Sequence, residues 1–466
     1  MSRQKFDYVI RVLTSPLAVD ATQWDALLQG QADANPFMRH AYLAALHESG
    51  AALPRTGWTP RFITLWRGEG MVAACALYLK AHSYGEYVFD HAWANAYQQH
   101  GLNYYPKAVV AAPFTPVPGA RLLARTQADR VALVQGLVAW CGEEKLSSLH
   151  LLFANDDDVA ACVSAGLMVR HTVQFHWTNS SQGFHSFDDF LASLSQEKRK
   201  KIRQERRKVA DAGVTFRWSL GADIAQVDWD FFYRCYERTY LEHGNAPYLS
   251  RDFFQRMADT MPANWLLFVA EREGKPIAAS LIAVSSNHAS STVNKTTTVH
   301  SKTTNLIASY AYGTRARGLN DPKNGLEHGF SGQTTASGPT ASEPTTWEPS
   351  ACEPAAGDRS EPNRRPDRIA YGRYWGALER VDCLHFEACY YQPLQWCIDH
   401  GYQRFEGGAQ GEHKMARALM PVKTSSTHWL AQPAFADAVE RFLAREGQGI
   451  DNYMTDLSQR SPFKQV

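Results

Sequence analysis

The chain has 466 residues, of which 44% are hydrophobic and 12% aromatic, and its formal net charge is +1. This length and composition predict more than one folded unit with a substantial core, and they exclude a wholly disordered or fibrous protein. The near-neutral charge excludes a chain-wide attraction to nucleic acid or membrane, although it leaves room for a local charged patch.

Cysteine usage and the N-terminus both indicate an intracellular protein. The eight cysteines form no CxxC pair, and several lie in apolar segments such as residues 72–77, which is typical of buried, reduced thiols. The charges of Arg3, Lys5 and Arg11 are not followed by an apolar signal-peptide region. No uncharged apolar stretch approaches the ~18 residues of a membrane span. We therefore expect a cytoplasmic protein with no membrane span and no metal site.

The first part of the chain alternates strand and helix patterns. The predicted strands cover residues 6–13, 62–66, 71–80, 107–112, 149–154 and 173–178, and the predicted helices cover 22–28, 39–49, 127–144 and 157–165. The Gly-containing turn at 67–70 predicts a hairpin between two of these strands.

The next part repeats this order. The predicted helices cover residues 186–212, 229–242 and 250–261, and the predicted strands cover 215–219, 265–271 and 276–284. In both parts, helices precede a strand, a charged turn with glycine and a longer strand. We interpret this parallel as two copies of one α+β unit.

Residues 285–367 interrupt the pattern with Ser, Thr, Pro and Gly. Such a composition cannot bury enough apolar surface to offset the entropy of ordering, so it predicts a disordered insertion that is dispensable for folding. After it, we predict strands over 369–378, 403–407 and 423–430 and helices over 383–400 and 434–446. The predicted domains are 1–178 and, around the insertion, 179–284 with 368–466.

Two segments of the first domain combine polar groups with aromatic residues. Residues 85–97 include Asp90 and Trp93, and residues 104–121 run from a strand into a Pro- and Gly-rich turn with Gly119 and Arg121. Backbone amides at such a turn can bind an anion. The alternative is an aromatic core beside a Pro-rich loop, and spacing alone leaves both interpretations open.

A third segment, residues 198–208, is a strongly basic helix in a near-neutral protein. Repulsion between like charges one turn apart destabilises such a helix, and an anionic partner would relieve it. The alternative is an ordinary solvated helix face. The candidate polyanion-binding residues are Lys198, Arg199, Lys201, Arg203, Arg206 and Arg207.

The last two segments follow the insertion. Residues 371–377 and 385–392 contain Arg373, Tyr374 and Trp375, then His385 and Glu387. In residues 405–417, Gly407 and Gly408 end a strand and allow close approach of backbone to a ligand, and Lys414 and Arg417 follow. The absence of a P-loop, GxSxG or HExxH pattern argues against a nucleotide hydrolase, a serine-type hydrolase and a zinc enzyme.

In order along the chain, segments 85–97, 104–121, 198–208, 371–377, 385–392 and 405–414 together resemble the Fem-like family. Its members are described as predicted N-acyltransferases linked to peptidoglycan biosynthesis or recognition. The resemblance implies an α+β fold of two tandem GNAT-like domains with mixed sheets. It also implies transfer of an acyl or aminoacyl group to an amine, with acyl-CoA or aminoacyl-tRNA as co-substrate and no tightly bound cofactor.

The acceptor would be a small molecule or a cell-wall precursor, and tRNA is a candidate partner. The alternative is a non-catalytic binding protein of the same fold that recognises a peptidoglycan precursor or a small molecule. Aminolysis of an ester or thioester needs a base and donors for the oxyanion, but no enzyme nucleophile. Catalysis would therefore require a carboxylate or a histidine near Gly407 in a narrow cleft.

We name Glu387, His385 and Asp90 as candidate bases, in that order, although Glu387 at a helix start is also a natural partner of the helix dipole. The candidate donor- and substrate-binding residues are Arg373, Tyr374, Trp375, Gly407, Gly408, Lys414, Arg417, Gly119, Arg121 and Trp93.

Overall fold

The structure is a computed structural model, and it describes residues 8–285, 368–409 and 411–464. The insertion predicted over residues 285–367 lies, apart from Ser285, outside the described residues, as does the start of the strand predicted from residue 6.

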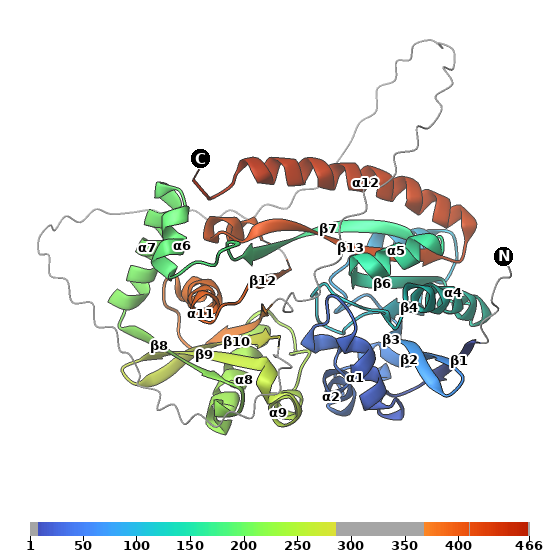
Figure 1. Ribbon diagram of the computed structural model, residues 1–466, viewed down its shortest axis with the longest axis horizontal. Coiled ribbons are helices and arrows are strands. Elements are labelled where there is room, and N and C mark those ends of the chain that lie inside the picture. The colour runs from blue at the N-terminus through green and yellow to red at the C-terminus, as the bar shows by residue number, and fades with distance from the viewer. Residues whose placement is uncertain (1–7, 286–367, 410, 465–466) are drawn as a thin grey trace, which may run out of the picture. The chain divides into compact units, whose positions relative to one another are not determined.

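One mixed sheet joins the strands of the described residues (Figure 1). Its strands are β1 (Tyr8–Leu13), β2 (Trp58–Arg67), β3 (Gly70–Lys80), β4 (Lys107–Val110), β5 (Leu123–Ala124), β6 (Ser148–Ala154), β7 (Met168–Thr178), β8 (Val214–Leu220), β9 (Trp265–Arg272), β10 (Lys275–Val284), β11 (Ile369–Ala377), β12 (Arg404–Ala409) and β13 (Met420–Leu430). β4 pairs in parallel with β6, and β11 with β12, while the other ladders are antiparallel. The predicted α+β class with a mixed sheet is confirmed.

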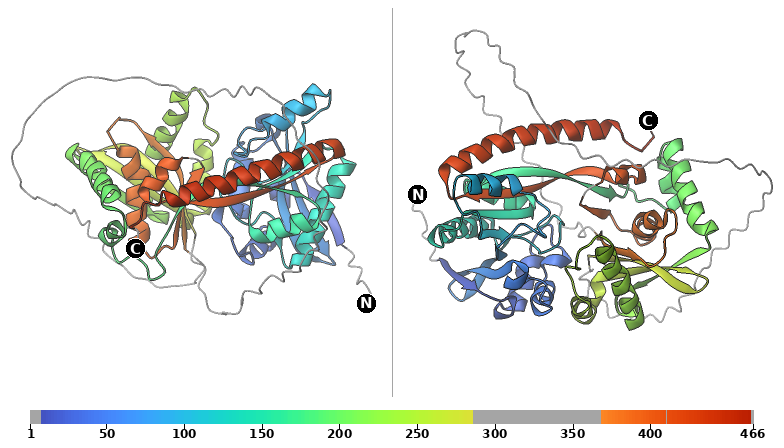
Figure 2. Two further views of the ribbon diagram at one scale, coloured as in Figure 1. Left: turned by 90° about the horizontal axis from the view of Figure 1, so that it is seen from above. Right: turned by 180° about the vertical axis from the view of Figure 1, so that it is seen from behind.

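Helices cover both faces of this sheet. They are α1 (Ala21–Gln29), α2 (His40–Glu48), α3 (His91–Gln99), α4 (Gln127–Glu143), α5 (Asp156–Ser164), α6 (Phe187–Ser193), α7 (Gln196–Asp211), α8 (Gln226–Glu242), α9 (Arg251–Thr260), α10 (Leu384–Phe386), α11 (Gln392–Asp399) and α12 (Pro433–Gln459). Figures 1 and 2 show α12 lying along β7 and β13. Within the described ranges, no helix has both the length and the apolar composition to cross a membrane.

The helix predicted over residues 186–212 is two helices, α6 and α7. Leu194 and Ser195 take extended backbone angles between them. The C-terminal segment stabilises this break, because the Ser195 amide donates to the Pro462 carbonyl at 2.9 Å and Leu194 forms a β-bridge with Phe463. Sequence patterns miss such a break because the partner lies more than 250 residues away along the chain.

The strand order links the two predicted domains closely. It runs β1-β2-β3-β4-β6-β13-β7-β12-β11-β10-β9-β8, with β5 beside β3. β13, from the C-terminal part of the chain, lies between β6 and β7 of the N-terminal part, and β7 continues onto β12. We keep the boundary at residue 178 as a proposal, with β7 and β13 as the strands shared between the two halves.

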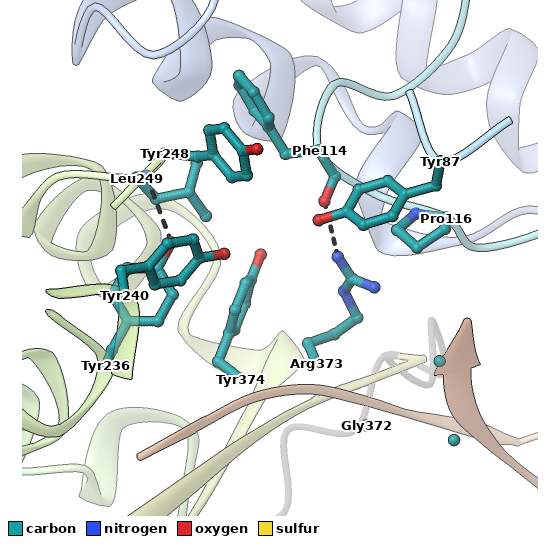
Figure 3. A pocket seen from close by; sticks show the side chains of 12 residues that line it. Tyr87, Phe114, Pro116, Tyr236, Tyr240, Tyr248, Leu249, Gly372, Arg373 and Tyr374 are labelled. Atoms are coloured by element: carbon teal, nitrogen blue, oxygen red, sulfur yellow. Dashed lines mark hydrogen bonds between the residues drawn. The ribbon is translucent and has the colours of Figure 1, made fainter. Parts of the chain in front are cut away.

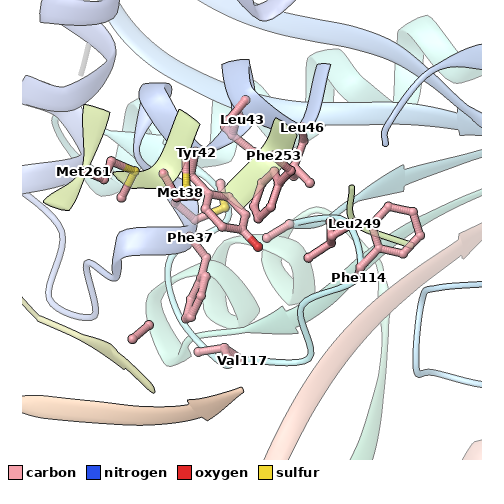
Figure 4. Close-up of a cluster of buried hydrophobic side chains, with 14 of the residues drawn as sticks. Phe37, Met38, Tyr42, Leu43, Leu46, Phe114, Val117, Leu249, Phe253 and Met261 are labelled. Atoms are coloured by element: carbon pink, nitrogen blue, oxygen red, sulfur yellow. The ribbon is translucent and has the colours of Figure 1, made fainter. Parts of the chain in front are cut away.

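A single aromatic core connects the N-terminal half with the second half (Figure 4). Tyr42 on α2 meets Phe253 on α9 edge to face at 5.5 Å, and Phe37 meets Tyr371 on β11 at 5.4 Å. All four side chains are buried. Because aromatic pairs prefer this geometry, the core fixes β11 relative to the first half.

Candidate active site

β11 and β12 separate after a short parallel ladder. The ladder ends where Tyr371 pairs with Glu406. A cavity of about 220 Å³ begins with the next residue of each strand, Gly372 and Gly407. The separation of the two strands therefore creates the site.

Both strands carry a bulge at this point. In β11, Gly372 pairs with Ile282 and Tyr374 with Leu281, so Arg373 has no partner in this ladder. In β12, the register with β7 shifts between Glu406 and Ala409, across Gly407 and Gly408. Bulges re-aim side chains and interrupt pairing, and they are common beside active sites. Here they bring Arg373 and the two glycines to the wall of the cavity.

Arg373 and Tyr374 point their polar ends into the cavity (Figure 3). Arg373 donates from Nη2 to the Phe114 carbonyl at 2.8 Å, while its buried Nε has no hydrogen-bond partner. The hydroxyl of Tyr374 is also buried without a partner. Buried polar groups normally find partners, so the two unsatisfied donors indicate a site for a hydrogen-bond acceptor.

Lys414 supports the glycine wall from behind. Its Nζ donates to the Gly408 carbonyl at 2.9 Å, and burial lowers the pKa of Lys414 to about 8. Gly408 has φ +78°, and a Cβ on Gly407 would lie 2.5 Å from Leu419. Both positions therefore require glycine, as their predicted close backbone approach implies.

Glu406 is a carboxylate that the sequence analysis did not single out. It directly precedes Gly407, is only 3% exposed, and its Oε2 has no hydrogen-bond partner. Oε1 forms an ion pair with Arg404 Nε at 3.1 Å. Burial raises the pKa of Glu406 to about 7, against the opposing charges of Arg404 and Arg373. Such a group can exchange a proton near neutral pH.

The aromatic wall of the cavity was also missed. It consists of Tyr87, Phe114, Tyr236, Tyr240 and Tyr248. Phe114 stacks on Tyr248 at 4.7 Å, and Tyr240 meets Tyr248 at 5.6 Å. The spacing of Tyr236 and Tyr240 on one helix face was a usable signal, but nothing local to Tyr87 or Phe114 indicates that they face α8.

Glu387, the first candidate base, lies outside the cavity lining and is bonded to other side chains. Arg206 Nε donates to Glu387 Oε1 at 3.1 Å, and Gln392 donates to the same oxygen at 2.8 Å. His385 packs edge to face against Trp375 at 5.5 Å. Its apolar surroundings and the nearby His413, as the first two causes, lower the pKa of His385 to about 4. Both remain predictions as bases.

Asp90, the third candidate base, belongs to a buried charge cluster behind Tyr87. Lys107 Nζ donates to Asp90, and to Glu86 at 2.7 Å. Ser83 and Tyr104 each donate to Asp90 at 2.6 Å. Burial alone would raise the pKa of Asp90, but Lys107 and the hydrogen bonds lower it. Asp90 is thus held ionised by an internal partner.

The other predicted binding residues take mainly structural contacts. Arg417 donates to Glu205 at 2.9 Å and stacks over Phe386. Trp375 packs beside His385, and Trp93 packs edge to face on His428 at 5.0 Å. Gly119 is held against Asn35, and Arg121 donates to backbone carbonyls, including that of Leu152 at 3.0 Å. Of the predicted binding residues, Arg373, Tyr374, Gly407 and Gly408 line the cavity together.

The basic residues of α7 do not share one surface. Arg206 turns inward to Glu387, and Arg203 forms an exposed ion pair with Asp188 at 3.6 Å. Arg199, Lys200, Arg203 and Arg207 recur along one face of α7. We call these four residues the basic stripe; polyanion binding by the stripe stays a prediction.

A family described as peptidoglycan biosynthesis/recognition, FemAB-like, matches residues 15–289 and 365–465. The chain belongs to the FemAB-like family. The match omits most of the predicted insertion, in agreement with its assignment as an addition to the family fold. FemAB-like membership confirms the resemblance seen in the sequence and supports a transferase role in peptidoglycan biosynthesis.

Solved structures resemble the chain along most of its length. FemX is 8% identical with a TM-score of 0.45, covering 92% of this chain and 100% of its own. L-PGS from Bacillus licheniformis is 10% identical with a TM-score of 0.44, covering 91% and 97%. A tandem GNAT protein from the clavulanic acid biosynthesis pathway is 11% identical with a TM-score of 0.39, covering 92% and 99%. No curated protein sequence matches the chain.

Proposed function

We propose that this chain is an N-acyltransferase that moves an acyl or aminoacyl group from a thioester or ester donor to an amine acceptor in the cavity between β11 and β12. The observation that carries this proposal is Glu406, a buried carboxylate with a free oxygen directly beside the glycine wall of the cavity. It fulfils the requirement for a carboxylate or histidine near Gly407.

The reaction needs no enzyme nucleophile. The nitrogen lone pair of the acceptor attacks the donor carbonyl, a C–N bond forms, and the C–O or C–S bond to the donor breaks. The amine proton passes to the Glu406 carboxylate, and the leaving oxygen or sulfur takes up a proton. The unpartnered Nε of Arg373 and hydroxyl of Tyr374 suit the carbonyl oxygen or another anionic substrate group.

The donor carries phosphate in both families of co-substrate that we consider, acyl-CoA and aminoacyl-tRNA. We propose that the basic stripe of α7 contacts this phosphate, since Arg199, Lys200 and Arg207 have no carboxylate partner among the described residues. Both donors are cytoplasmic molecules, so the proposal places the reaction there. The acceptor would be a cell-wall precursor or a smaller amine.

The test is formation of an amide product, followed by mass spectrometry, with acyl-CoA and aminoacyl-tRNA donors and amine acceptors. Glu406→Gln should lower the turnover number by about 100-fold or more, because a positioned base contributes roughly 10²–10⁴ to the rate. Glu379→Gln, on the exposed loop after β11, is the matched control and should retain wild-type turnover.

Full transfer activity in Glu406→Gln would remove Glu406 from the mechanism. Acceptor binding without any product from either donor class would favour the alternative, a binding protein of the same fold.

A further inference from the structure

The cavity between β11 and β12 holds a cation that no carboxylate neutralises directly. Arg373 forms no ion pair within 4.0 Å with any described acidic residue, and its one printed hydrogen bond goes to a carbonyl. Guanidinium groups remain charged in proteins, and a carboxylate is their best-matched partner because it accepts two parallel hydrogen bonds.

A second unsatisfied donor points to the same place. The hydroxyl of Tyr374 is buried and unpartnered, and its ring centre lies 5.4 Å from the Arg373 guanidinium. Figure 3 shows both polar ends directed into the space that the tyrosine rings surround. Two donors side by side in an otherwise aromatic pocket favour an anion with oxygen acceptors over a neutral ligand.

The opposite side of the cavity is aromatic. Tyr236, Tyr240 and Tyr248 form a continuous wall, with ring centres 4.8 Å and 5.6 Å apart. The hydroxyl of Tyr236 already accepts from the Leu249 amide at 3.4 Å. Ring faces pack against apolar groups and attract an ammonium. The volume, about 220 Å³, is below the roughly 300 Å³ at which common ligand pockets begin, so the occupant is small.

We propose that the cavity binds a small amino acid with a free carboxylate and an apolar side chain, and that this amino acid is the amine acceptor. Its carboxylate pairs with Arg373 and Tyr374, its side chain packs on the wall of Tyr236, Tyr240 and Tyr248, and its amine lies beside Gly407 near Glu406. The binding mode stands on the contacts above, and the role of acceptor rests on the proposed transferase function.

Binding can be tested without any donor. Calorimetric titration of the full chain with L-phenylalanine and L-phenylalanine amide compares two ligands that differ only in the carboxylate. The acid should bind wild type about tenfold or more tightly than the amide, since a charge-assisted bidentate pair contributes at least one decade in affinity. Arg373→Met should abolish this preference, and Arg373→Lys should keep part of it.

Arg380→Met, an exposed arginine after β11, is the matched control and should preserve the preference. If Arg373→Met does not fold, Tyr374→Phe replaces it and should reduce the preference severalfold. Equal affinity for acid and amide in wild type, or no detectable binding of either, would overturn the inference. Preference for the acid with no transfer from any donor would overturn the acceptor role and the transferase function while the binding mode stands. Transfer to amines regardless of a carboxylate would overturn the inference alone.

Discussion

Replacing Lys107 by Met should strongly destabilise the protein, because Lys107 is the buried partner of two carboxylates. The Lys107 side chain is 0% exposed, and those of Glu86 and Asp90 are 1% and 4% exposed. Removing one partner of a buried ion pair typically costs about 3–5 kcal/mol, since the remaining charge stays in a low-dielectric interior. We expect about 4 kcal/mol at about pH 8, where the carboxylates would otherwise be ionised.

The pH dependence of this loss identifies its cause. In wild type, the lowered pKa of Asp90 contributes stability above the unfolded pKa, and this contribution disappears as the pH falls. In Lys107→Met that contribution is missing, and both carboxylates can be neutralised by protonation. The difference from wild type should therefore shrink as the pH falls from about 8 towards about 4.

Urea denaturation followed by tryptophan fluorescence at several pH values measures this difference. Lys275→Met, at the exposed start of β10, is the control for loss of a surface lysine and should change stability by less than about 0.5 kcal/mol. Adding Glu86→Gln and Asp90→Asn to Lys107→Met should recover much of the loss. A penalty below about 1 kcal/mol, or one that does not change with pH, would refute the uncompensated-charge explanation.

Three further results follow from the same contacts. Glu387→Gln should cost about 2 kcal/mol through its ion pair with Arg206 while transfer persists; loss of transfer here and not in Glu406→Gln would reinstate Glu387 as the base. Glu406→Gln should be more stable than wild type by up to about 3 kcal/mol at about pH 8, because the folded pKa near 7 exceeds the model-compound value of 4.5 and the charged form is disfavoured as the pH rises between them; thermal melts should show this gain vanish below about pH 4.5, and a less stable variant would contradict it. Arg203→Glu with Arg207→Glu should reduce the salt dependence of tRNA binding by about one logarithmic unit per lost contact; an unchanged slope would leave the basic stripe a solvated helix face.

Local patterns were sufficient to predict much of the fold. The hairpin of β2 and β3 follows from two apolar strands around a glycine turn, and α9 follows from its strong apolar face with Ser250 as N-cap. α3 was missed because its segment, residues 91–99, has little apolar content and was interpreted as a binding motif. The position of β13 between β6 and β7 depends on pairing across more than 240 residues, which no local signal encodes.

The site was predicted where it depends on glycine and arginine chemistry. Gly407 and Gly408 are visible in the sequence because only glycine allows such close backbone approach, and Arg373 stood in a motif of the family. Glu406 was quoted beside them but not selected, since its burial and its free oxygen arise only when β12 packs between β7 and β11. The partnership of Glu387 with Arg206 likewise depends on the packing of α7.

The most direct test of the central claim is the pH dependence of amide formation in wild type and Glu406→Gln, measured as product mass at saturating donor. A base with a pKa near 7 must be ionised to accept the amine proton, so the wild-type rate should rise with pH to about 7 and then level off. Glu406→Gln should be slower by about 100-fold or more and should lose this inflection. Equal rates with the same inflection in both proteins would show that acyl transfer does not depend on the carboxylate between β11 and β12.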